Sequence, residues 1–120
     1  MAYDDIYEIC DKICGIKAPE HWKEEGVEDP SEEVMEASIG LICDIFEKIE
    51  EFPEVIAPTV ENGIYLRYKR DNISMVFEIY NEDLSVGCLI NNDKDKEILF
   101  SEDLGSSSLE QVLYAFEMES

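Results

Sequence analysis

The chain has 120 residues, 45% of them hydrophobic, and its 30 acidic side chains against 9 basic ones give a net charge of −21. The length and hydrophobic content predict one folded domain over residues 1–120 and exclude a disordered chain. The charge argues against direct nucleic-acid binding, because neutralising phosphates requires clustered Lys and Arg. Two reasons for so many acids remain, namely solubility and a basic partner.

The chain shows neither a membrane span nor an export signal. No apolar run approaches the roughly 18 residues of a membrane helix, and the opening residues MAYDDIYE lack a basic segment followed by an apolar one. We therefore expect a cytoplasmic protein. In a reducing compartment the four cysteines are expected as buried thiols rather than as a disulfide framework. They are Cys10, Cys14, Cys43 and Cys88.

The N-terminal segment predicts one helix followed by a loop. Apolar side chains recur at helical spacing over residues 3–14, and Gly15 suits the end of that helix. Residues 16–28 are polar and include Pro19 and Gly26, which predicts a loop.

A second, longer helix is predicted from the segment DPSE, with Asp29 as its N-cap, to about Glu51, before Phe52-Pro53. Its apolar positions form a wide stripe, which is typical of a helix with a well-covered face. These positions are Val34, Met35, Ala37, Ser38, Ile39, Leu41, Ile42, Ile45, Phe46 and Ile49.

After Pro53 the hydrophobic period changes to two. Apolar residues alternate with others over residues 64–69, 75–80 and 84–91, and Ile98 and Phe100 indicate a short fourth strand. Residues 55–60 are a further candidate, which Pro58 would confine to a sheet edge. Turn-like sequences separate the segments, so we predict an antiparallel meander of three to four strands with one buried face.

A last helix is predicted after Ser107, which forms a candidate capping box with Glu110. Its apolar stripe comprises Leu109, Val112, Leu113 and Phe116. The predicted fold class is therefore α+β, with an N-terminal helix, a long central helix, the meander and a C-terminal helix, and with the helices on one sheet face.

Cys10, Cys14 and His21 are candidates for a metal site or a small catalytic site. Cys10 and Cys14 share a predicted helix face, but the paired spacing common in zinc sites is absent, and no nucleophile motif surrounds His21. Core cysteines and a loop histidine are the preferred interpretation. We predict no catalytic residue, no cofactor and no metal ligand, and keep a metal-binding protein or enzyme as the alternative.

The one basic cluster consists of Arg67, Lys69 and Arg70. Arg67 and Lys69 should lie on the outer sheet face, where we expect them to neutralise nearby acids, with Glu78 on the neighbouring strand as the candidate partner. An anion site is the less favoured interpretation.

The acidic surface carries the main functional signal. Residues 1–60 contain 17 acids and 4 bases, so the excess is largest in the helical half. Rows of carboxylates on a rigid helix resemble spaced phosphates and would suit a basic nucleic-acid-binding surface, although a merely solvated face is the alternative. The candidate partner-binding residues are Glu24, Glu25, Glu28, Glu33, Glu36, Asp44 and Glu47.

Two motifs carry a resemblance to a known family. Trp22, Gly26 and Pro30-Ser31 have the spacing W-x3-G-x3-P-S, and a proline-led segment leads to Gly63-Ile64-Tyr65-Leu66-Arg67-Tyr68. Over residues 21–80 the chain thus resembles a family of small uncharacterised bacterial proteins. It departs from that family at Lys23-Glu24-Glu25 and at Tyr68, where the family has D-G-Y and a second tryptophan. The resemblance implies the fold and a bacterial or phage origin, and it implies no site.

The sequence therefore predicts a small non-enzymatic protein that binds and masks a basic nucleic-acid-binding protein or nuclease. Antitoxins and phage-encoded inhibitors of bacterial defence, including anti-CRISPR proteins and other nucleic-acid mimics, are the classes that fit. The alternatives are the metal-binding protein or enzyme and a housekeeping accessory protein whose charge serves solubility. An exposed strand edge would also permit a homodimer.

Overall fold

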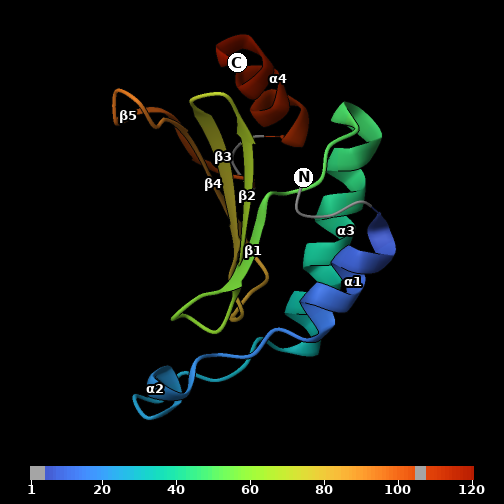
Figure 1. The fold of residues 1–120 in the computed structure, drawn as a ribbon, viewed down its shortest axis with the longest axis vertical. Coiled ribbons are helices and arrows are strands. Elements are labelled where there is room, and N and C mark those ends of the chain that lie inside the picture. Colours follow the sequence, from blue (N-terminus) through green and yellow to red (C-terminus); the bar gives the residue numbers. More distant parts are fainter. Residues whose placement is uncertain (1–4, 105–107) are drawn as a thin grey trace.

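The computed structural model describes residues 5–104 and 108–120, and it has the predicted α+β architecture (Figure 1). The helical elements are α1 (Ile6–Cys14), α2 (Glu20–Lys23), α3 (Glu32–Ile49) and α4 (Leu109–Glu119). The strands are β1 (Val55–Pro58), β2 (Ile64–Arg70), β3 (Ile73–Ile79), β4 (Val86–Asn92) and β5 (Glu97–Asp103).

The five strands form one antiparallel sheet in the order β1-β2-β3-β4-β5. This is the predicted meander. The candidate strand over residues 55–60 is present as β1, which pairs with β2 and brings the total to five. Pro58 closes β1 at the sheet edge, as its missing N–H requires.

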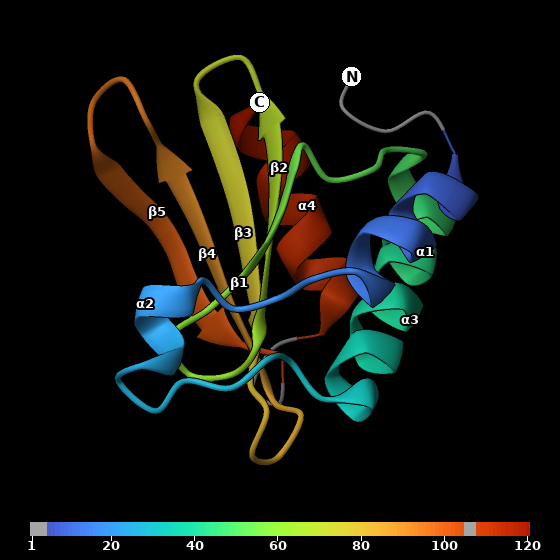
Figure 2. The same cartoon turned by 60° about the horizontal axis from the view of Figure 1, so that its bottom comes forward.

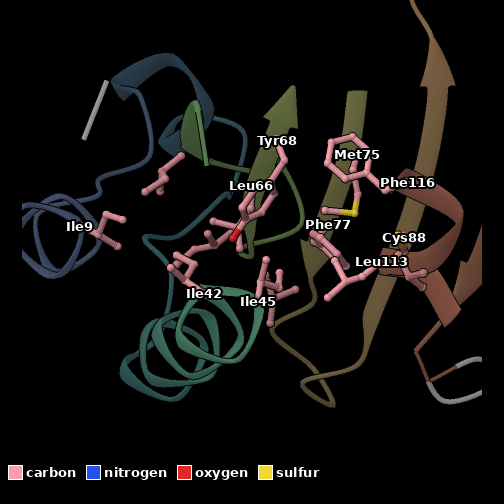
Figure 3. Packing of buried hydrophobic residues seen from close by; sticks show 14 of the residues in the cluster. Ile9, Ile42, Ile45, Leu66, Tyr68, Met75, Phe77, Cys88, Leu113 and Phe116 are labelled. Carbon is pink, nitrogen blue, oxygen red and sulfur yellow. The ribbon is translucent and has the colours of Figure 1, made fainter. Parts of the chain in front are cut away.

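The three predicted helices, α1, α3 and α4, lie on one side of the sheet, as predicted, and the short α2 lies apart from them (Figures 1 and 2). Helix α3 contacts β2 and β3, α4 contacts β3 and α3, and α1 packs on α3. Figure 3 shows Ile42 and Ile45 of α3 and Leu113 and Phe116 of α4 meeting the inner residues of the sheet. Each large apolar side chain buried there contributes about 1.5–3 kcal/mol. The buried inner sheet residues are Ile64, Leu66, Tyr68, Met75, Phe77, Ile79, Cys88 and Ile90.

The start of α3 differs from the prediction. Ser31 is the N-cap, and its Oγ accepts a hydrogen bond from the Val34 N–H at 3.3 Å. Asp29 instead accepts the N–H of Ala18 at 2.7 Å, a contact across eleven residues that the local pattern cannot show. The helix ends at Ile49 because Glu50 adopts a left-handed conformation with φ of 55°.

Three other predicted boundaries are adjusted. Helix α1 is capped by Asp5, while the start predicted at residue 3 lies outside the described residues. The predicted loop 16–28 contains the short helix α2. The capping box of α4 joins Ser108 and Gln111, one residue later than predicted, and Ser107 lies outside the described residues.

Candidate acidic interface

Four of the seven candidate carboxylates lie along one face of α3. At about 100° of rotation per residue, Glu33, Glu36, Asp44 and Glu47 fall within roughly 80° of one another. That sector lies almost opposite the buried side of the helix, and all four side chains are exposed. The amphipathic pattern that buries the apolar side of α3 therefore directs these four residues, which we call the α3 stripe, into solvent.

Neighbouring helices flank the α3 stripe without covering it. On one side, Ile6 of α1 shares a cavity of about 390 Å³ with Cys43 and Phe46 of α3. On the other side, Lys48 of α3 forms an ion pair of 3.0 Å with Glu110 of α4. The stripe thus occupies the exposed sector between α1 and α4, and at a rise of about 1.5 Å per residue it extends over roughly 21 Å.

The charges of the α3 stripe are not paired. Among residues 5–104 and 108–120, none of its carboxylates forms an ion pair. The pKa of the nearby Lys48 is raised mainly by its hydrogen bond to Glu110 and, to a smaller extent, by Glu47 and Asp44. Glu33 lies in the first turn of α3, where a negative charge stabilises the helix N-terminus, so the fold alone gives one reason for an acid at this position.

The other three candidates, Glu24, Glu25 and Glu28, follow α2 in a separate segment of the structure (Figure 1). Gly26 has φ of 93° and lets the chain turn between them, as its position in the sequence suggested. The backbone N–H of Glu28 donates to Asn62 Oδ1 at 2.8 Å, which connects this segment to the turn between β1 and β2.

Three further acids lie at this end of the sheet, and sequence reasoning missed them. Glu61, Glu82 and Asp83 line one cavity of about 520 Å³ together with Asn62. In a meander, the β1–β2 and β3–β4 turns lie at the same end, so the turn positions carried a signal that could have grouped these residues. We call the combined set the acidic end, and it comprises Glu24, Glu25, Glu28, Glu61, Glu82 and Asp83.

The basic cluster is neutralised, but not by the predicted partner. Asp93 lies 3.3 Å from Arg67 and 4.0 Å from Lys69, and it also accepts a hydrogen bond from the buried Ser74. Glu78 forms no ion pair within the described residues, and the strand register places it opposite Tyr65, diagonal to Arg67.

Arg70 lies apart from the other two basic residues of β2. It forms an ion pair of 2.8 Å with Glu51, and its guanidinium lies 4.8 Å from the centre of the Phe116 ring. This contact connects the end of β2 to α4 through a cation–π interaction.

The structure does not assemble the candidate metal site. Within the described residues, no three His, Cys, Asp or Glu side chains converge to hold a metal ion. His21 lies on α2 beside Trp22, with the ring centroids 6.0 Å apart. Cys10 instead lies near the thiols of Cys14 and Cys43, and its pKa is raised by partial burial and then by these two groups.

The prediction of buried thiols is correct for Cys88, whose pKa is raised to about 12 by burial. It is wrong for Cys14 and Cys43, which are exposed because one occupies the end of α1 and the other the solvent-facing flank of α3. Cys10 is half-buried.

The fold and these surfaces together define an acidic α+β protein in which carboxylates without an ion pair in the described chain gather along α3 and at one end of the sheet. A scan against protein-family models, a search of curated proteins and a search of solved structures each find no match. In the part of the chain that the structure describes, no helix has the length and apolarity needed to cross a membrane.

Proposed function

We propose that this protein is a small, non-enzymatic acidic binding protein that occupies the basic nucleic-acid-binding surface of another protein, such as a nuclease. The observation that carries the proposal is the α3 stripe, in which Glu33, Glu36, Asp44 and Glu47 are exposed on one helix and form no ion pair within the described residues.

A row of fixed carboxylates is suited to this role for two physical reasons. Helix α3 is held by the core, so little backbone conformational entropy is lost when its outward side chains meet Lys and Arg of a partner. The net charge of −21 also accelerates encounter with a basic surface by long-range attraction, which salt screens. Antitoxins and phage-encoded inhibitors of bacterial defence, including anti-CRISPR proteins, are classes in which such a nucleic-acid mimic would act.

The test compares two variants that remove the same charge. The stripe variant carries Glu33→Gln, Glu36→Gln, Asp44→Asn and Glu47→Gln. The matched control carries Glu54→Gln, Asp71→Asn, Glu117→Gln and Glu119→Gln, which are exposed positions outside both the α3 stripe and the acidic end. Each immobilised protein is exposed to bacterial lysate at low salt, and the affinity of the captured protein is then measured with and without competing duplex DNA.

We expect wild type and the control variant to capture a basic protein that DNA displaces, and the stripe variant to bind it about 100-fold more weakly. If wild type captures no basic protein, the proposal is wrong and the charge serves solubility. Equal weakening by both variants would contradict a role for the α3 stripe, because net charge alone would then govern binding.

A further inference from the structure

The two edges of the sheet differ in their capacity to pair with another strand. Strand β1 has four residues and ends in Pro58, which blunts that edge. Strand β5 has seven residues and no proline, and within the described residues no strand pairs with its far side (Figure 2). A strand edge of this kind carries backbone N–H and C=O groups that are free to pair.

The direction of these backbone groups follows from one hydrogen bond. The N–H of Leu104 donates to the carbonyl of Val86 on β4 at 2.9 Å. Along a strand, the backbone N–H groups of successive residues point alternately to one side and to the other. The N–H of Glu102 therefore also points toward β4, whereas those of Ser101 and Asp103 point away. The register is regular over this part of β5, so the alternation is not interrupted there.

The side chains of β5 determine which side chains an added neighbouring strand should have. Glu97, Glu102 and Asp103 are acidic, the strand contains no base, and Ile98 is 64% exposed. A second copy of the chain would bring a further charge of −21 to this edge and is repelled. In a segment that alternates basic and apolar residues, the basic side chains would all lie on one sheet face and would neutralise the carboxylates of β5 on that face.

The outer sheet face beside β5 offers a second feature for basic side chains. A cavity of about 440 Å³ is bordered by Glu78, Gly87, Ser101 and Asp103. Gly87 supplies no side chain to fill it, and the register places Gly87 next to Asp103. A Lys or Arg on a strand added beside Asp103 would therefore extend over an acidic rim.

We propose that β5 accepts an extended segment of a basic partner as a sixth strand, held by the outward backbone groups of Ser101 and Asp103 and by the acids of β5. The inference rests on the proposed function, because it takes the partner to be basic. It adds the form of the partner segment and a docking position that is separate from the α3 stripe.

The probe is a short synthetic peptide in which lysine and valine alternate, with a peptide alternating glutamate and valine as the control. Amide hydrogen exchange of the full chain is followed by NMR. We expect the lysine peptide to protect the amides of Ser101 and Asp103 while leaving β1 unchanged.

Ser101→Pro removes an outward N–H without breaking the β4–β5 ladder, and we expect it to weaken binding about tenfold or more. Ser101→Ala keeps the N–H and removes the hydroxyl, so we expect it to bind more tightly than Ser101→Pro.

Circular dichroism and thermal melting verify that Ser101→Pro stays folded. If a folded Ser101→Pro binds as tightly as wild type, or if protection falls on α3 instead of β5, strand addition is wrong while the proposed function stands. If the glutamate peptide binds equally well, the charge selection is wrong. Capture of no basic protein by wild type in the lysate experiment would reject the proposed function independently of any result at β5.

Discussion

The α3 stripe and the outer face of the sheet differ in whether their carboxylates form ion pairs in the described chain. On the sheet, Asp93 neutralises Arg67 and Lys69 and accepts a hydrogen bond from the buried Ser74. On α3, four exposed carboxylates stand without an ion pair in the described chain, although Lys48 on the same helix pairs with Glu110 of α4.

The difference separates acids that stabilise the fold through ion pairs from acids whose charge is available to a partner. Six of the nine basic residues form ion pairs in the described residues, and none of these pairs uses a carboxylate of the α3 stripe. Removing the paired Asp93 from the sheet face should therefore cost stability, whereas removing an acid of the α3 stripe should cost none, and this contrast can be measured.

The largest stability effect is expected for Asp93→Ala. The substitution leaves two cations unpaired and removes the acceptor of Ser74, which is only 2% exposed. Surface ion pairs are weak, but a buried hydroxyl that loses its acceptor is costly, so we expect a loss of about 1–2 kcal/mol in the free energy of unfolding. Urea denaturation at neutral pH measures this quantity.

The matched variant is Glu36→Ala, which removes one carboxylate from the α3 stripe. Alanine favours the helix and the change relieves repulsion, so unfolding should be unchanged or slightly harder. Equal destabilisation by the two variants would remove the distinction between the two regions.

The inner sheet face holds a polar group without compensation, the hydroxyl of Tyr68. In the described structure it is buried and has no hydrogen-bond partner, and its pKa is raised by burial and by the nearby Glu51 and Cys43. Tyr68→Phe removes this hydroxyl and keeps the ring that meets Phe77 at a centroid distance of 6.0 Å. We expect a gain of about 1 kcal/mol, measured as a higher midpoint of thermal unfolding.

Tyr65→Phe on the same strand is the control, because Tyr65 lies half-buried on the outer face. It should leave the midpoint unchanged. A loss of stability in Tyr68→Phe would mean that the hydroxyl has a partner in solution.

Much of the fold was predictable because it depends on local periodicity. The alternation over residues 64–69 and 75–80 identified the buried face of β2 and β3, and the stripe of α3 identified its core side. Where the prediction was wrong, a distant contact decided the outcome. Asp29 fits an N-cap by its neighbours, but the N–H of Ala18 takes its carboxylate and Ser31 caps the helix.

The candidate interface was predictable only in part, for a similar reason. Helical geometry placed Glu33, Glu36, Asp44 and Glu47 on one face of α3, since their spacing fixes their direction. The partner of Arg67 was not predictable, because choosing between Glu78 and Asp93 requires the strand register. Register depends on turn geometry, which the alternation of residues does not specify.

The smallest effect is expected at Glu78, an acid of the outer sheet face that has no ion pair in the described chain. Its pKa is raised by partial burial and then by the negative charge of Glu61. A raised pKa means that the folded state binds the proton more tightly than the unfolded state does. Stability from this group is therefore present at low pH and is lost as the pH rises from the ordinary glutamate pKa through the raised value.

Glu78→Gln should remove this loss, so the variant is more stable than wild type at neutral pH by under about 1 kcal/mol. The difference should shrink as the pH falls through the raised pKa toward the ordinary glutamate pKa, below which Glu78 is protonated in both states. Urea denaturation of both proteins across this pH range measures the difference, and Glu82→Gln controls for the removal of one charge from an exposed turn. A difference that grows as the pH falls would have the wrong sign and would show that the folded structure stabilises the carboxylate of Glu78.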